Sequence, residues 1–275
     1  MSQSSLEPSV PENDPAVTKS SLKFFVVGIG ASAGGLPALL QFFEQMPASN
    51  GMAFVVVLHL SPKHDSAADA ILQRATRMKV IQVVQRTRIE ANHVYVTAPN
   101  LALSMTDGYL DVSSLQRPIG QHIAIDGFFR TLADVHKDRA VAIVLSGTGA
   151  DGAVGLARIK EQGGVTIAQA PEDAEHEGMP IASIQTGMVD FILPVNDIPQ
   201  KLTELWNNAR NIVLPPLGDG EQPLAAAETV SNAEAEDALQ NIITLLRTQT
   251  GHDFRHYKRA TVLRRIERRL QAGLP

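Results

Sequence analysis

Apolar residues along the chain fall either into short continuous runs or into segments where they recur at helical spacing. The continuous runs predict strands at residues 24–29, 53–60, 140–147, 163–170 and 189–195. The helical spacing predicts a first helix that ends near residue 45, and further helices at about 66–77, 123–136, 151–162, 180–187 and 197–209. Uniformly apolar strands that alternate with helices are typical of a parallel sheet covered on both faces. We therefore predict an α/β fold with a doubly wound, mostly parallel sheet.

Residues 80–112 depart from this alternation. They contain strand-like runs at 80–84 and 93–98, followed by two further runs on either side of Asp107-Gly108. Asp-Gly between apolar runs is a strong hairpin signal. The region is therefore expected to form an antiparallel hairpin insert or an edge of the sheet.

The two ends of the chain differ in composition from the predicted α/β domain at residues 24–210. Residues 1–23 are polar and contain prolines, which predicts a flexible N-terminal arm. Prolines and glycines break any periodicity at residues 211–233, as in a linker. Residues 234–275 regain helical spacing and are expected to form part of an all-α module. The apolar positions of its two predicted helices are Leu239, Ile242, Ile243 and Leu246, then Val262, Ile266 and Leu270.

The composition excludes several classes of protein. The 275 residues include no cysteine, which excludes disulfides, thiolate chemistry and cysteine-ligated zinc and fits a reducing, cytoplasmic location. The N-terminus lacks the apolar core of a signal peptide, and no apolar run approaches the ~20 residues that cross a bilayer. No membrane insertion is therefore expected. The net charge of −5 is uneven, because residues 247–275 hold eight Lys and Arg residues against only Asp253 and Glu267.

The stretch VVGIGASAGGLPAL at residues 26–39 allows two interpretations. Gly28, Gly30 and Ala33 form a loose dinucleotide-binding fingerprint. Gly30, Ser32 and Gly34 form a G-x-S-x-G pattern, in which a sharp strand-to-helix turn presents a nucleophilic serine. A dinucleotide site also needs a carboxylate at the end of the second strand, and that strand ends VVVLHL without one. The nucleophile is therefore favoured, and no cofactor is expected.

Two further residues stand where a serine nucleophile needs them. A histidine must accept the serine proton, and a carboxylate must orient that histidine. Ser32 follows the first strand, His59 ends the second, and Asp151 follows the strand at 140–147. Because the carboxyl ends of parallel strands face one crevice, we predict Ser32, His59 and Asp151 as a catalytic triad. Each also has a plain structural interpretation: a turn residue, a strand-edge residue and a helix N-cap.

A metal site is not expected in this sequence. His59, His64 and Asp65 are the nearest approach to one, but the separation of the two histidines fits neither a helical pair nor a strand pair, and no clear third ligand accompanies them.

Four segments in order, IGASAGG, VVLHLSP, VLSGTGADGA and EHEGMPIASIQTGMVDFILP, resemble motifs of the bacterial chemotaxis receptor methylesterases of the CheB type. The resemblance covers about residues 24–205. It implies a catalytic triad at Ser32, His59 and Asp151. It also implies that backbone N–H groups of His59 and Thr148 bind the oxyanion.

The sequence departs from this family in some details. Ala33, Leu58 and Thr148 stand where many members have Thr, Gln and Met. Since residue 148 would act through its backbone, we expect the activity to be tuned rather than abolished. Stand-alone members also carry a receiver domain before the catalytic domain. About 23 residues occupy that place here, so phosphorylation control is not expected within this chain.

The resemblance implies a function as well as a fold. It predicts a serine hydrolase that demethylates γ-glutamyl methyl esters of chemoreceptors and also deamidates glutamines. Its partners would be the cytoplasmic helices of methyl-accepting chemoreceptors. Two alternatives stay open: a catalytically silent adaptor that docks receptors, and a nucleotide-binding α/β protein.

The basic end resembles the start of the N-terminal helical domain of CheR-type receptor methyltransferases. The elements T-G-x-D-F, Y-K and R-R-I-x-R-R within residues 239–275 carry this resemblance, which ends before any S-adenosylmethionine-binding domain. The chain thus resembles the front part of a methylesterase–methyltransferase fusion. A helix here would place like charges side by side: Arg264 with Arg268, and Arg265 with Arg269. An anionic partner would relieve this repulsion. The resemblance implies that this partner is an acidic receptor helix rather than nucleic acid.

Overall fold

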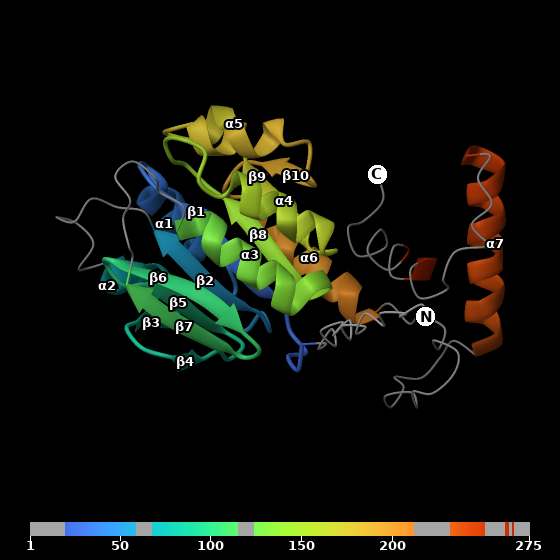
Figure 1. The fold of residues 1–275 in the computed structure, drawn as a ribbon, viewed down its shortest axis with the longest axis horizontal. Helices are drawn as coiled ribbons and strands as arrows, with labels where there is room; N and C mark the ends of the chain where they lie inside the picture. The colour runs from blue at the N-terminus through green and yellow to red at the C-terminus, as the bar shows by residue number, and fades with distance from the viewer. Residues whose placement is uncertain are drawn as a thin grey trace, which may run out of the picture.

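The structure is a computed structural model that describes residues 20–58, 68–114, 124–211 and 232–250, together with residues 262, 263 and 266. Its centre is a seven-stranded sheet in the order β10-β9-β8-β1-β2-β5-β3, in which every neighbouring pair is parallel (Figure 1). These strands are β1 (Val26–Ala31), β2 (Ala53–Leu58), β3 (Lys79–Val83), β5 (His93–Thr97), β8 (Ala140–Val144), β9 (Val165–Gln169) and β10 (Phe191–Leu193). The predicted doubly wound α/β fold is confirmed.

Helices cover both faces of this sheet. On one face lie α1 (Gly35–Gln45), α2 (Ala68–Ala75) and α6 (Ile198–Asn211). On the other lie α3 (Ala124–His136), α4 (Ala153–Glu161) and α5 (Gly178–Gln185). Successive strand residues point to opposite faces, and both faces are apolar here: in β1, Val27 and Ile29 belong to the first core and Val26 to the second. The strands are therefore buried on both sides, as their uniform hydrophobicity predicts.

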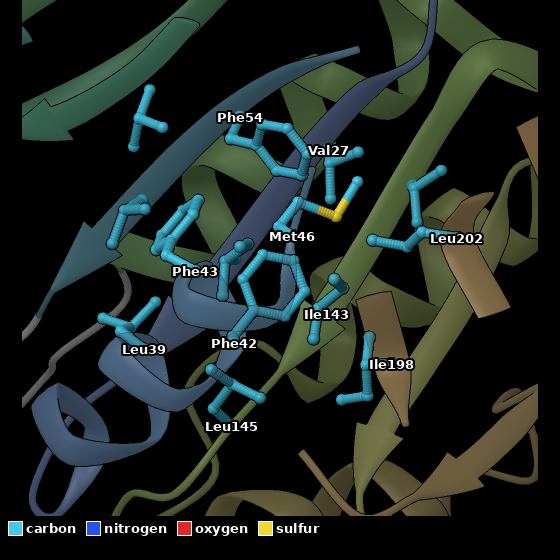
Figure 2. Packing of buried hydrophobic residues seen from close by; sticks show 14 of the residues in the cluster. Val27, Leu39, Phe42, Phe43, Met46, Phe54, Ile143, Leu145, Ile198 and Leu202 are labelled. Atoms are coloured by element: carbon cyan, nitrogen blue, oxygen red, sulfur yellow. The ribbon is translucent and has the colours of Figure 1, made fainter. Parts of the chain in front are cut away.

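The first core is built around aromatic side chains of α1 and β2. Phe42, Phe43 and Phe54 meet edge to face, with ring centroids 5.0 to 5.9 Å apart (Figure 2). Each of the three is 0–1% exposed. Burying one such side chain stabilises the fold by about 1.5–3 kcal/mol, so this cluster fixes α1 firmly on the sheet.

On the opposite face, α3 approaches β1 more closely than side chains on β1 would permit. A Cβ atom at Gly28 would lie 2.9 Å from Cε1 of Phe129, and one at Gly30 would lie 2.4 Å from Cγ2 of Ile125. Both glycines lie within β1 and not in the turn after it. Helix–strand packing therefore accounts for both glycines, and they give the dinucleotide interpretation of this stretch no support.

The region at 80–112 divides between the two sheets. β3 and β5 form one edge of the parallel sheet. A separate three-stranded antiparallel sheet contains β4 (Thr87–Arg88), β6 (Leu101–Thr106) and β7 (Tyr109–Ser114). The hairpin predicted at Asp107-Gly108 joins β6 to β7, and Gly108 supplies the positive φ of 76° that the turn requires.

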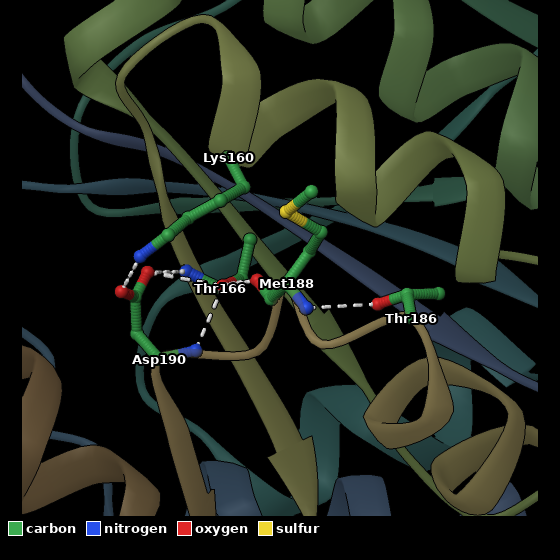
Figure 3. Close-up of polar contacts among 5 residues, drawn as sticks. All are labelled: Lys160, Thr166, Thr186, Met188 and Asp190. Carbon is green, nitrogen blue, oxygen red and sulfur yellow. Dashed lines mark hydrogen bonds and ion pairs between the residues drawn. The ribbon is translucent and has the colours of Figure 1, made fainter.

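A polar cluster joins β9 to the segment before the edge strand β10. Asp190, just before β10, pairs with Lys160 of α4, and its carboxylate accepts the backbone N–H of Thr166 on β9 at 3.1 Å (Figure 3). The Thr166 hydroxyl in turn accepts the Asp190 N–H at 3.0 Å. These bonds lie at the amino end of β9, away from the edge where the predicted triad gathers.

The C-terminal helices follow their predicted pattern as far as they are described. α7 (Asn232–Thr250) is a helix, and residues 262, 263 and 266 are helical. Leu239 and Ile243 of α7 pack with Val262, Leu263 and Ile266. Most of the predicted linker lies outside the described residues, and so do Arg264, Arg265, Arg268 and Arg269 of the basic end. No helix of the described segments is both long and apolar enough to span a bilayer.

Ser20 is the first described residue, and it lies within the predicted N-terminal arm. The hydroxyl of Ser20 lies 2.8 Å from Nδ1 of His136 and donates to Asp107 at 3.1 Å. Because that donation uses the only hydroxyl proton, Nδ1 of His136 carries a proton and donates to Ser20. Nε2 then faces the apolar interior, where it has no hydrogen-bond partner among the described residues. Residues 1–19 lie outside the described part.

We predict that His136 makes folding sensitive to mild acid. Burial lowers its pKa to about 4, with Arg139 acting in the same direction and Asp107 opposing. The unfolded chain has the ordinary value of about 6.5, so the unfolded state binds more protons between these two values. The stabilisation is complete above about pH 6.5 and declines as pH falls toward 4. The free energy of unfolding should drop by about 2 kcal/mol from this group between pH 7.5 and pH 5.

Denaturant unfolding at the two pH values measures this effect. His136→Phe should lose less stability on acidification than wild type by about that amount, whereas His176→Gln, at a half-exposed position, should keep the wild-type difference. An unchanged pH dependence in His136→Phe would contradict the assignment.

Candidate active site

Ser32 lies in a sharp turn between β1 and α1. The N–H of Gly35 donates to the carbonyl of Ser32 at 2.9 Å, and Gly34 has φ 68° and ψ 0°. Ala33 is not among the residues with positive φ, so Ser32 to Gly35 form a type II turn with Gly34 at its third position. A Cβ at Gly34 would lie 2.7 Å from both Oγ of Ser146 and Cβ of Glu175. Only glycine fits, and the predicted strand-to-helix turn is present.

The loop after β8 lies directly against this turn. The N–H of Ser32 donates to the carbonyl of Ser146 at 3.0 Å. A Cβ at Gly147 would lie 3.0 Å from Cβ of Ser32 and 2.1 Å from Sδ of Met179. Since Gly147 has no side chain, the loop can approach Ser32 to van der Waals distance. Thr148 follows at once and is exposed.

Asp151 caps a helix, but not the helix that it precedes. Gly152, with φ 99°, is the N-cap of α4, and as a glycine it has no side chain of its own that could cap the helix. The Asp151 carboxylate instead accepts the N–H groups of Ile125 (3.1 Å, to Oδ2) and Asp126 (2.9 Å, to Oδ1), in the first turn of α3. Both oxygens thus satisfy amides that a helix terminus leaves without intrahelical partners. The interpretation of Asp151 as the N-cap of its own helix is wrong.

Asp126, in turn, caps the amino end of α4. Its Oδ1 accepts the N–H of Gly152 at 3.1 Å and the N–H of Gly155 at 2.6 Å, and the residue is 8% exposed. The two helices are therefore capped reciprocally. Asp151, just before α4, caps α3, and Asp126, in the first turn of α3, caps α4. Asp126 is not among the site residues that the sequence predicts. Its signal is a carboxylate in the first turn of a predicted helix, among the apolar residues Ile125 and Phe128.

The reciprocal caps affect the ionisation of Asp151. Burial raises the pKa of its carboxyl group, and the neighbouring charge of Asp126 acts in the same direction. The N–H groups of Asp126, Ile125 and Gly152 oppose this shift, because they bind the charged form. Asp151 is thus a half-buried carboxylate held by backbone amides.

Ile125 joins the two halves of the site. Its Cγ2 lies 2.4 Å from the position of a Cβ on Gly30 and 2.9 Å from that of a Cβ on Gly152. One contact is two residues before Ser32 and the other is next to Asp151. The same side chain therefore sets the spacing between the turn at Ser32 and the loop that carries Asp151.

The predicted site residues are described unequally. Ser32, Thr148 and Asp151 lie at the carboxyl edge of the sheet, on the β1 turn and the β8 loop. His59 follows the last residue of β2 and lies outside the described residues, as do His64 and Asp65. The catalytic roles of Ser32, His59 and Asp151, and the backbone roles of His59 and Thr148, stay predictions. Among the described residues no three His, Asp or Glu side chains group in a way that could hold a metal ion.

Comparison with known proteins identifies the family. The family model described as CheB methylesterase matches residues 27–202, and that described as the all-alpha domain of CheR methyltransferase matches residues 237–273. The chain belongs to the CheB methylesterase family. It is an enzyme of the methylesterase class, with the beginning of a CheR-type helical domain behind it.

Individual relatives agree with this placement. A relative from Leptospira interrogans, provisionally named a protein-glutamate methylesterase/protein-glutamine glutaminase, is 30% identical over 188 residues, which are 68% of this chain and 97% of the relative. A Pyrococcus abyssi protein-glutamate methylesterase/protein-glutamine glutaminase is 33% identical over 178 residues, which cover 63% of this chain and 48% of that protein. The crystal structure of the Thermotoga maritima CheB methylesterase catalytic domain matches with a TM-score of 0.62 and 27% identity, covering 67% of this chain and all of that one.

We predict that Asp126→Ala destabilises the fold by about 1–3 kcal/mol, because two buried N–H groups lose their acceptor. Asp126→Asn should cost less, since one carbonyl oxygen can accept both N–H groups as Oδ1 does now. Asp134→Ala provides a control on the same helix, where an exposed carboxylate pairs with Arg158 and should contribute at most about 1 kcal/mol. Denaturant unfolding of the three variants measures the order, and equal losses at residues 126 and 134 would refute the capping role.

Proposed function

We propose that the chain hydrolyses γ-glutamyl methyl esters on the cytoplasmic helices of chemoreceptors, and that it also deamidates glutamines there. The observation that carries this proposal is the type II turn at Ser32, held directly against the loop that leads to Asp151. Family membership supports the reaction class. The names of the relatives, which pair methylesterase with glutaminase, support both substrates.

In the proposed reaction, Oγ of Ser32 attacks the ester carbonyl carbon while His59 accepts the serine proton. The imidazolium then gives that proton to the departing methanol, which leaves an acyl-enzyme. A water molecule, deprotonated by His59, releases glutamate and restores Ser32. Asp151 would orient the imidazole and stabilise its charged form. In deamidation the same steps release ammonia.

The oxyanion that forms in each step needs donors in place before the reaction. We assign this role to the backbone N–H groups of His59 and Thr148, where loss of one donor costs about 3 kcal/mol of transition-state stabilisation. The amino end of α1 begins immediately after the turn and adds a favourable dipole beside Ser32.

The domain boundaries are part of the proposal. We assign residues 24–210 to the methylesterase domain, 211–233 to a linker and 234–275 to the CheR-type helical module. The extents of the two family matches, 27–202 and 237–273, support these limits. We also propose that the basic end, with Arg268 and Arg269, binds an acidic receptor helix.

Ser32→Ala tests the nucleophile. The variant should fold like wild type and lose at least about a thousandfold in turnover, since the other members of the triad cannot act without it. Methanol release from methylated receptor membranes measures the reaction, and thermal melting checks the fold. Release at the wild-type rate would refute the assignment of Ser32, whereas no release by wild type itself would favour the silent adaptor.

Asp151→Asn should have two separable effects. Turnover should fall by about 100-fold or more, because an amide favours the wrong imidazole tautomer. The free energy of unfolding should also fall by about 1–3 kcal/mol, because the amide nitrogen would face the N–H of Ile125 or Asp126. Activity is therefore compared at a temperature where melting shows the variant to be folded. A loss of turnover under about threefold there would leave Asp151 as a cap of α3 alone.

A further inference from the structure

Ser146 is a fully buried residue at the junction of three segments of the site. Its exposure is 0%, and each of its polar groups has a partner. Its carbonyl accepts the N–H of Ser32 at 3.0 Å. Its hydroxyl donates to the carbonyl of Ala33 at 2.9 Å and accepts the N–H of His176 at 2.9 Å. Two bonds from one residue thus go to consecutive residues of the nucleophile turn.

The bond to Ala33 acts on the central peptide of that turn. Type I and type II turns differ mainly in the orientation of this peptide, which is rotated by roughly 180° between them. Glycine at the third position tolerates both forms, so Gly34 permits the type II form without selecting it. The Ser146 hydroxyl holds the Ala33 carbonyl on the buried side, which is the orientation found here. Rotation of the peptide would break this bond and reverse the Gly34 N–H, two residues from Ser32.

A second buried side chain holds Ser146 itself. Oε1 of Gln169, which is 2% exposed, accepts the Ser146 N–H at 2.9 Å. Nε2 of Gln169 donates to the Asp173 carboxylate at 2.8 Å, and that carboxylate also accepts the N–H of Val195 at 2.8 Å. The hydroxyl therefore extends from a backbone fixed to the ends of β9 and β10, so its direction is set before substrate arrives.

We propose that Ser146 is a positioning residue of the methylesterase, whose hydroxyl holds the nucleophile turn in its type II form and thereby fixes the place of the Ser32 hydroxyl. The inference rests on the proposed function, because it assigns the effect to the reaction of Ser32. It also makes a claim about the turn that does not depend on activity. Ser146 touches no reacting atom and acts through the backbone of residues 32–34.

Ser146→Ala removes one oxygen atom and leaves the backbone bonds to Ser32 and Gln169 in place. We expect kcat for methanol release to fall at least tenfold while KM changes less than twofold, because the surface that meets the receptor is unaltered. Ser146→Thr, which keeps a hydroxyl on the same carbon, should restore most of kcat. If Ser146→Ala does not fold, Ser146→Cys, with a weaker donor, should show the same fall.

Ser183→Ala is the matched control. Ser183 is also 0% exposed, and its hydroxyl donates to the carbonyl of Met179 at 2.9 Å within α5. This variant loses an equally buried hydroxyl and should keep kcat within twofold of wild type. A wild-type kcat in Ser146→Ala, or equal falls in both variants, would overturn the positioning role.

A spectroscopic measurement separates this inference from the proposed function. The backbone amide resonance of Gly34 in ¹H–¹⁵N spectra reports the turn directly. It should move or broaden in Ser146→Ala and stay unchanged in Ser183→Ala. If wild type releases no methanol, the proposed function fails while the resonance still decides the claim about the turn. An unchanged Gly34 resonance in Ser146→Ala overturns that claim.

Discussion

The close contact of α3 with β1 is the constraint on which the site depends. Gly28 and Gly30 leave the part of β1 beyond Val26 without side chains on this face, and Phe129 and Ile125 occupy that space. The contact brings the first turn of α3 to the carboxyl end of the sheet, where its free amides meet the loop after β8. Any side chain at Gly30 would push Ile125 away and would disturb the turn at Ser32 and the cap at Asp151 together. The glycines of the opening motif therefore act through packing, one layer beneath the chemistry.

Capping converts this packing into a fixed electrostatic arrangement. Asp126 and Asp151 stand close together, and burial together with the neighbouring charge of Asp126 raises the pKa of the Asp151 carboxyl group. Each is compensated by N–H groups from the first turn of the opposite helix, where unpaired donors and the helix dipole favour negative charge. The charge proposed to orient a histidine is therefore balanced by backbone groups that cannot rotate away. A lysine or arginine partner would also compensate the charge, but its flexible side chain would compete with the histidine for the same oxygens.

The sequence predicted most of the fold and only part of the site. Strands buried on both faces leave uniform apolar runs, and Asp107-Gly108 marks its hairpin, so local signals suffice for these elements. Ser32 and Asp151 could be placed at one edge because parallel strands end there together. The roles of Asp126 and Ser146 could not be predicted, because their hydrogen-bond partners lie more than 20 positions away in the sequence. Neither residue breaks the local pattern of apolar and polar positions. Gly28 and Gly30 suggested a dinucleotide site for the same reason. A glycine in a sequence indicates only that a side chain does not fit there, and only the structure identifies the neighbour that excludes it.

The two polar networks also explain the form of the loop between Ser146 and Gly152. Ser146 fixes its start to the nucleophile turn and to Gln169, and Asp151 fixes its end to α3. Between these anchors, Thr148, Gly149 and Ala150 are exposed. A loop held at both ends can present its middle to a large protein substrate without losing the geometry beneath it. The side chain at residue 148 faces solvent in this arrangement, whereas the position of its backbone is set by the two anchored ends of the loop. That division fits the proposal that residue 148 acts through its backbone N–H rather than through its side chain.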